Sequence, residues 1–203
     1  MKTLGFILGK DEEAEKYLQW RNLYEQPIRD KAASVKEEDK PRLFMEWGTK
    51  NTNSEISSYG MGSSGDSVSN FTGGANIAAA LPEYPKVDSE WVLEENPDVI
   101  VRSLAPDSGS SGWKDSDEAA GILKKYIEGR PGWSRLDAAK NNRIYPISTE
   151  IAWGPDSIVG DAYYARWLHP TLDIDPEKIY KEYLEQFMGL EYPEGVVLGY
   201  PAK

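Results

Sequence analysis

The sequence predicts an α/β fold: a mostly parallel sheet with helices on both faces, preceded by one long helix. Two observations support this prediction. Short apolar segments rich in strand-forming residues, at 42–47, 98–102 and 143–148, alternate with longer segments of helical periodicity, and such alternation is typical of parallel sheets covered by helices. The first periodic segment, 11–37, is long and polar on its outer side, so we expect it to lie across a larger unit.

The long helix is predicted from its apolar spacing. Apolar side chains recur every three or four positions and share one helical face. Acidic residues fill the first turn, where the helix dipole favours negative charge. Pro27 lies inside the pattern and is expected to kink the helix or to break it locally. The residues of the apolar face are Ala14, Tyr17, Leu18, Tyr24, Ile28, Ala32 and Val35.

Caps and breaks place the elements that follow. Lys40-Pro41 ends the long helix, and the strand at 42–47 runs into a loop rich in Gly, Ser and Asn. The segment 66–81 carries a helix that Gly73-Gly74 ends by a left-handed cap. The stretch "VDSEWVLEENPDVIV" (87–101) is a helical turn that leads through Asn-Pro-Asp into a strand.

The second half of the chain follows the same pattern. Residues 116–142 are predicted to be helical, with a break at Arg130-Pro131-Gly132. Pro155 lies near the first position of a further helix, and Asp175-Pro176 caps and starts the last one. We expect the final residues, 191–203, to form a loosely held tail.

Composition excludes several kinds of function. The chain has 34 acidic against 23 basic residues and a net charge of −11, which argues against nucleic acid as a partner and against adhesion to anionic lipid. No apolar run approaches the ~20 residues that span a bilayer. Cysteine is absent, so disulfides, thiolate metal sites and cysteine nucleophiles are excluded. The single histidine, His169, is expected to have a structural role at the end of a helix.

Two further patterns could suggest an enzyme. The loop "YGMGSSGDS" (59–67) is rich in glycine like a phosphate cradle, but it lacks the Gly-Lys-Ser/Thr ending of a P-loop, and a flexible connection is the favoured interpretation. No Gly-x-Ser-x-Gly elbow surrounds Ser89 or Ser148. We therefore predict that the chain is not an enzyme and carries no cofactor and no metal ligands of its own.

Aromatic residues and one arginine gather at predicted strand ends. Trp47, Tyr59, Arg102, Trp113 and Trp153 lie at or just beyond the carboxyl ends of predicted strands. In open parallel sheets ligands bind at that edge, and aromatic faces with a cation suit flat or anionic ligands. The alternative is that the tryptophans only pack the core. Taken together, these residues favour a binding face.

Several motifs, in order, resemble one family. "NFTGGANIA", "VDSEWVLEENPDVIV", "GWSRLDAAKNNRIYPIS" and the segment "AWGP…AYYARWLHP" are similar to motifs of class III periplasmic substrate-binding proteins. These clamp-like receptors bind iron–siderophore complexes, cobalamin or haem and serve ABC importers. The resemblance covers roughly residues 3–190.

The resemblance implies a division of the chain. In the family, one long helix joins two α/β lobes that hold the ligand between them. Here residues 1–10 would be a remnant preceding the bridging helix, 11–38 the bridging helix, 40–190 the C-terminal lobe and 191–203 a tail. The N-terminal lobe would be missing, so we expect the chain alone to bind ligand weakly or not at all.

The resemblance also assigns residues and partners. Trp47, Tyr59, Arg102 and Trp153 would bind a small-molecule metal chelate, with an iron–siderophore ahead of cobalamin, haem or an oxyanion. Glu90 would dock on the permease of the ABC importer, whereas local physics alone only places it where it complements a helix dipole. The protein would be extracytoplasmic, in the periplasm or at the cell surface, with or without a lipid anchor. The alternatives are a cytoplasmic enzyme or cofactor-assembly subunit of similar α/β architecture, and a non-enzymatic interaction domain.

Overall fold

A four-stranded sheet lies at the centre of the computed structural model, which describes residues 1–48, 52–104, 113–193 and 195–200. Its neighbouring strands all pair in parallel, in the order β3-β1-β5-β6. Each strand predicted from the sequence is present within two residues of its expected ends, which confirms the parallel sheet. The strands are β1 (Arg42–Trp47), β3 (Ala75–Asn76), β5 (Val99–Leu104) and β6 (Ile144–Ser148).

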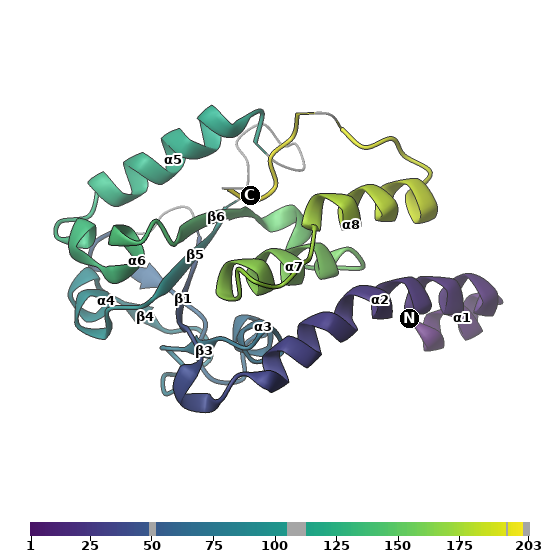
Figure 1. Ribbon diagram of the computed structural model, residues 1–203, viewed down its shortest axis with the longest axis horizontal. Coiled ribbons are helices and arrows are strands. Elements are labelled where there is room, and N and C mark those ends of the chain that lie inside the picture. The colour runs from purple at the N-terminus through teal and green to yellow at the C-terminus, as the bar shows by residue number, and fades with distance from the viewer. Residues whose placement is uncertain (49–51, 105–112, 194, 201–203) are drawn as a thin grey trace.

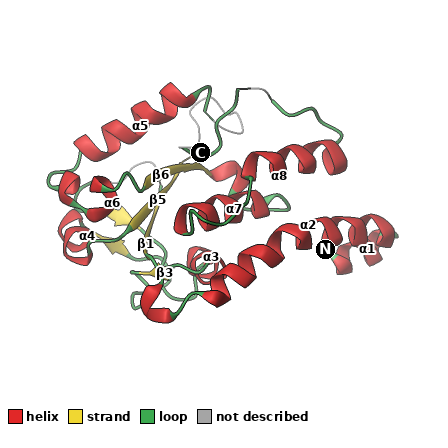
Figure 2. Cartoon of the chain, in the orientation of Figure 1, coloured by secondary structure: helices red, strands yellow, loops and turns green. Residues whose placement is uncertain are grey.

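Helices cover both faces of this sheet, as predicted (Figures 1 and 2). On one face pack α2 (Asp11–Ser34), α3 (Ser64–Thr72), α7 (Ser157–Leu168) and α8 (Pro176–Tyr183), the last continued by a π-helical turn, Leu184–Met188. On the other face pack α4 (Ser89–Glu95), α5 (Ser116–Glu128) and α6 (Asp137–Lys140). The short elements are α1 (Lys2–Leu8), β2 (Ile56–Ser57) paired antiparallel with β4 (Lys86–Val87), and the 3-10 turns Glu37–Asp39, Trp133–Arg135 and Thr149–Ile151.

The alternation of side chains along each strand explains the two layers. In β1, Leu43 and Met45 join the core under α2, α7 and α8, whereas Phe44 joins the core under α4 and α5. In β5, Val99 and Val101 point to the first core and Ile100 to the second. A strand buried on both faces is an almost continuous apolar run, which is why the sequence shows no polar alternation in these segments.

Helix α2 is the predicted long helix, and it ends at Ser34 rather than at residue 38. It runs through Pro27 without a break. Pro27 lacks the N–H that would bond to the carbonyl of Leu23, and both residues are exposed, so water can satisfy that carbonyl. Trp20, which the apolar spacing did not select, is buried and donates its Nε1–H to Glu182 of α8 at 3.0 Å.

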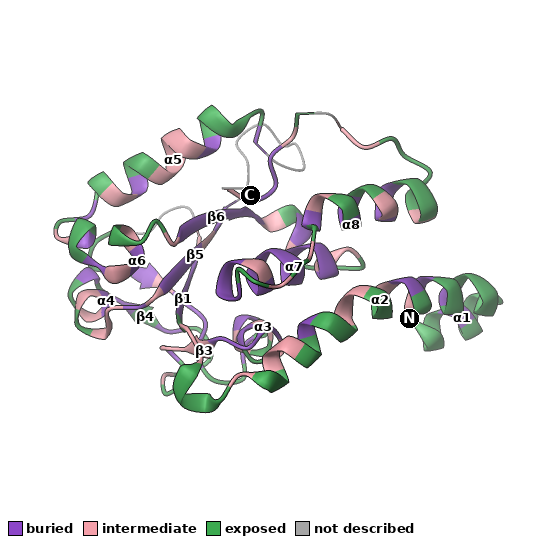
Figure 3. Cartoon of the chain, viewed as in Figure 1, coloured by how far each residue is buried: buried purple, intermediate pink, exposed green. Residues whose placement is uncertain are grey.

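A short helix, α1, precedes α2 and folds back on it (Figure 1). A left-handed turn at Gly9 separates the two helices. Gly5 makes their approach possible, since a Cβ at that position would lie 2.6 Å from the Cβ of Ala14. The apolar side chains of Leu4, Phe6 and Ile7 remain exposed on α1, so Figure 3 shows this end of the molecule largely green.

The predicted helix ends agree with the structure where a cap was identified. Gly73 ends α3 with φ +79°, and Asp175 caps α8 by accepting backbone N–H groups at 3.1 and 3.2 Å. Pro155 lies two residues before α7 rather than in its first turn. Gly132, with φ +85°, makes the turn that follows α5.

The C-terminal segment corrects one expectation. Val197 and Leu198 are buried, and residues 197–200 pair with earlier parts of the chain. The N–H of Ser148 donates to the carbonyl of Leu198 at 2.7 Å, and the N–H of Tyr200 donates to the carbonyl of Pro146 at 3.1 Å. The prediction of a loosely held tail is therefore wrong for these residues, because the open edge of β6 offers them hydrogen-bonding partners.

None of the helices in the described part of the chain is long and apolar enough to cross a membrane. The same residues contain no cluster of three or more His, Cys, Asp or Glu side chains that could hold a metal ion.

Candidate ligand-binding site

An exposed aromatic pocket lies at the carboxyl end of β1. Its volume is about 230 Å³. Trp47 and Trp153 are 47% and 43% exposed, whereas Tyr59 at its base is buried. The structure therefore brings together three of the four residues predicted to bind ligand. The residues that line this aromatic pocket are Trp47, Tyr59, Ser64, Tyr84 and Trp153.

The base of the aromatic pocket is fixed by backbone contacts. Tyr59 follows the bridge between Ser58 and Glu46, and its carbonyl accepts the side-chain amide of Asn76 at 2.9 Å. Gly65 of α3 lets the ring of Tyr59 lie against the helix, because a Cβ there would come within 2.4 Å of the ring. Burial raises the pKa of Tyr59, so its hydroxyl stays neutral.

The rim of the pocket is made by aromatic rings at ordinary contact distances. The ring centroid of Tyr59 lies 6.2 Å from that of Trp153 and 6.4 Å from that of Trp47. Tyr84 lies 6.3 Å from Trp47 and completes the rim. Sequence reasoning missed Tyr84, whose only signal is an aromatic residue in a proline-flanked loop. Such a surface can stack on a flat or apolar ligand.

Arg102 lies apart from the aromatic pocket. Its register partner on β1 is Glu46, so the two side chains share the face that α5 covers. Its Nε lies 3.3 Å from a carboxylate oxygen of Glu46, and its guanidinium lies 4.5 Å from the ring centroid of Tyr126. Trp113, the other residue noted at a strand end, is buried and pairs with Val197.

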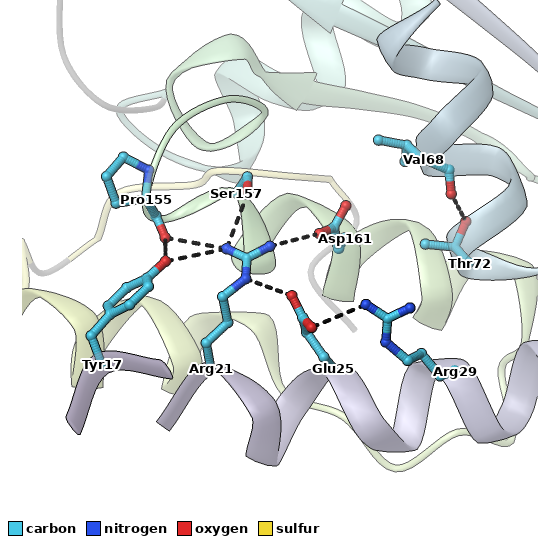
Figure 4. Close-up of polar contacts among 9 residues, drawn as sticks. All are labelled: Tyr17, Arg21, Glu25, Arg29, Val68, Thr72, Pro155, Ser157 and Asp161. Atoms are coloured by element: carbon cyan, nitrogen blue, oxygen red, sulfur yellow. Dashed lines mark hydrogen bonds and ion pairs between the residues drawn. The ribbon is translucent and has the colours of Figure 1, made fainter. Parts of the chain in front are cut away.

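A second hollow, the polar pocket, lies beside the aromatic pocket and shares Trp153 with it. It has a volume of about 310 Å³, is open to solvent, and lies between α2, α3 and the start of α7. A ladder of alternating charge on α2 forms one wall, and Asp161 of α7 faces it (Figure 4). The residues that line it are Arg21, Glu25, Arg29, Ser67, Val68, Phe71, Ala152, Trp153, Gly154, Ser157 and Asp161.

Glu90 lies on an exposed, well-anchored turn. Asp88 caps α4 by accepting the N–H of Trp91 at 2.8 Å, and Ser89 accepts the indole N–H of Trp133 at 3.1 Å. Within the described residues, no hydrogen bond or ion pair engages the carboxylate of Glu90. Glu90, together with Leu93 and Arg135, lines a hollow of about 610 Å³.

Two other sequence features have structural roles. The loop at 59–67 is held by its own contacts rather than being a flexible connection: Asp66 accepts the N–H of Gly62 at 3.2 Å, and Ser63 accepts the N–H of Asp66 at 3.1 Å. The Nε2 of His169 lies 2.9 Å from the carbonyl oxygen of Thr72 and therefore carries a proton. Burial lowers the pKa of His169 and keeps the ring neutral.

Comparisons with known proteins show which family this sequence resembles. Residues 1–150 match the sequence model of a family described as "Periplasmic binding protein". The chain is 22% identical over 172 residues to YvrC of Bacillus subtilis (strain 168), described as an uncharacterized ABC transporter substrate-binding lipoprotein. That match covers 84% of this chain and 49% of YvrC, so the chain spans about half the length of this relative.

Solved structures share the fold. The TroA-like periplasmic binding protein FepB of Veillonella parvula superposes with a TM-score of 0.84 at 23% identity, over 98% of this chain and 58% of that one. Molybdate-bound MolA of Haemophilus influenzae gives 0.66 at 22% identity, over 95% and 55%. A protein of the ABC-type Fe3+-hydroxamate transport system of Saccharomonospora viridis gives 0.62 at 19%, over 83% and 53%.

The family match covers most of the chain, from α1 through β6. Members of this family bind substrates and are not enzymes, which confirms the prediction that the chain is not an enzyme. The chain belongs to the periplasmic binding protein family.

Proposed function

We propose that the chain is the substrate-binding component of an ABC importer and that its ligand is a metal chelate, with an iron–siderophore the first candidate. The aromatic pocket carries this proposal. It exposes two large indoles beside a buried tyrosine at the sheet edge where α/β proteins bind ligands. The described residues offer no metal-ligating cluster, which fits a metal that arrives already chelated.

Proteins similar to this chain support the same class of ligand. YvrC is described as an ABC transporter substrate-binding lipoprotein, and the Saccharomonospora viridis protein belongs to an Fe3+-hydroxamate transport system. MolA binds molybdate, which makes an oxyanion the second candidate. A protein of this class would act outside the cytoplasm, in the periplasm or at the cell surface, with or without a lipid anchor.

We also propose that the ligand is held between this chain and a preceding lobe. Residues 1–10 would then lead into the bridging helix at 11–38, and 40–190 would form the C-terminal lobe. An open, half-exposed aromatic pocket can cover one side of a ligand only, so the chain alone is expected to bind weakly. Micromolar binding by the 203-residue chain would contradict this.

Fluorescence titration with a ferric trihydroxamate complex and, separately, with molybdate tests the ligand class. The exposed indole of Trp153 is expected to be quenched by the ferric complex, and Trp153→Ala should weaken binding about 3- to 10-fold, as expected for loss of one aromatic stack. Phe6→Ala, on the exposed face of α1, is the control and should leave affinity unchanged. Quenching by molybdate alone would favour the oxyanion.

Glu90 is our proposed contact with the permease. Its exposed carboxylate has no partner among the described residues, and its helical turn is anchored from both sides. A guanidinium of the permease could form charge-assisted hydrogen bonds with it. In a transport assay, Glu90→Lys should reduce uptake without changing ligand affinity. Glu94→Lys on the same helix should leave uptake unchanged. Unchanged uptake in Glu90→Lys would refute the assignment.

A further inference from the structure

The carboxylate of Asp161 is buried and has no hydrogen-bond partner within the described residues. Asp161 as a whole is 9% exposed. It lines the polar pocket and also a narrow crevice beneath Trp153. The nearest cation is the guanidinium of Arg21, whose Nη2 lies 3.7 Å away, beyond hydrogen-bond distance. A buried carboxylate left in this state is costly unless a donor reaches it.

The other nitrogens of Arg21 are committed to different partners, so only its Nη2 faces Asp161 (Figure 4). Its Nε donates to Glu25 at 2.6 Å, and its Nη1 lies 3.3 Å from both Tyr17 Oη and Ser157 Oγ. Burial raises the pKa of Asp161 to about 7, and the opposing effect of Arg21 is smaller. Burial therefore outweighs the ion pair with Arg21 at this carboxylate.

The surroundings of Asp161 are aromatic. Tyr59, Trp153 and Tyr164 line the crevice with it, and Phe71 lines the polar pocket. The face of Phe71 is already covered by the guanidinium of Arg29, at 4.7 Å from the ring centroid. An anionic oxygen among aromatic faces is the arrangement that binds alkylammonium groups, through an ion pair and cation–π contacts.

The charges of α2 that face Asp161 are Arg21, Glu25 and Arg29. Glu25 accepts hydrogen bonds from both arginines, at 2.6 and 3.2 Å. With Asp161 ionised, the two acids and two bases balance. The chain as a whole carries −11, so the wider field favours a cation over an anion.

We propose that Asp161 is a specificity-determining residue that receives a protonated alkyl amine of the ligand in the polar pocket. The proposal rests on the proposed function, because Trp153 lines both pockets and a chelate stacked on it could extend an amine-bearing arm toward Asp161. Ligands without an amine would occupy the aromatic pocket alone.

Carboxyl NMR titration of the chain tests this directly, with n-butylammonium as the probe and butyrate as its matched anion at constant ionic strength. Butylammonium should lower the pKa of Asp161 by about one unit or more, as a close opposite charge does. Asp137 on α6, whose pKa is lowered by its hydrogen bond with Lys140, lies on the other face of the sheet; it is the internal reference and should not respond. No shift of Asp161, or a rise produced by butyrate, would overturn the proposal.

A paired titration separates this proposal from the proposed function. An amine-bearing ferric trihydroxamate should bind more tightly than its N-acetylated form, and Asp161→Asn should remove the difference. Equal binding of the two chelates would refute the role of Asp161 while leaving the chelate receptor intact. Absence of binding by either chelate, with the butylammonium shift present, would count against the chelate and not against the amine site.

Discussion

Two buried carboxylates of this molecule have opposite surroundings. Glu46 accepts two hydrogen bonds from Arg130, at 2.5 and 2.8 Å, and one from the hydroxyl of Tyr126. Asp161 faces Arg21 without a hydrogen bond. The comparison shows that burial alone does not decide what an acid does. Full hydrogen bonding makes Glu46 a structural anchor between β1 and α5, whereas Asp161 remains open to a partner.

Glu46→Gln should produce the largest change in stability. It leaves Arg130 buried without its counter-charge, which costs roughly 3–5 kcal/mol in comparable buried pairs. Urea unfolding measures the loss. Glu95→Gln is the matched control, because the ion pair between Glu95 and Arg42 is at the surface and such pairs contribute about 0–1 kcal/mol. Equal losses in the two variants would show that Glu46 is no anchor.

Asp161→Asn should stabilise the folded chain, whereas Glu46→Gln should destabilise it. The pKa of Asp161 is raised from 3.8 to about 7 in the folded chain. The folded state therefore binds the proton of this carboxyl group more tightly than the unfolded state does. The stability that the bound proton contributes is fully present below pH about 4 and is lost as the pH rises through about 7. The variant should be more stable than the parent at pH 8, by a few kcal/mol at most, and no more stable at pH 4.

Unfolding midpoints of both proteins, measured across this pH range, test the predicted pH dependence. The parent chain should lose stability between pH 4 and 7 relative to Asp161→Asn, and the difference should level off above pH 8. A constant difference at all pH values would mean that the carboxylate of Asp161 ionises normally in the folded chain.

Arg102→Met sharpens the first half of the comparison and should have the smallest effect. Its guanidinium stacks on Tyr126 and lies near Glu46, so its loss should cost about 1 kcal/mol. The sequence predicted a ligand-binding role for Arg102, yet the residue lies outside the aromatic pocket. Chelate affinity should therefore stay unchanged in Arg102→Met, and a weaker affinity would restore the sequence prediction.

The sequence predicted features that depend on local chemistry. Gly73 marks the end of α3 and Asp175 the start of α8, and short apolar runs predict the strands. It also placed Trp47, Tyr59 and Trp153 at one edge, because parallel strands end together. Such positions are set by neighbours in the sequence or by the common edge at which parallel strands end. They can therefore be predicted without the three-dimensional structure.

Other features depend on which elements meet in space. Helix α7 is buried almost all round, so its apolar pattern does not mark Asp161 as different from its neighbours. The acid becomes informative only once Arg21 of α2 is known to lie opposite it. Likewise, Tyr84 and the pairing of Leu198 with Ser148 follow from tertiary contacts that no local motif encodes.

The pairing of the C-terminal segment has a consequence for the behaviour of the chain in solution. One edge of the central sheet is β3, a strand of two residues, which offers little to another chain. The other edge is β6, and residues 198–200 cover it. Both edges are thus protected against strand addition from a second molecule. Removal of residues 196–200 should expose β6 and promote concentration-dependent self-association.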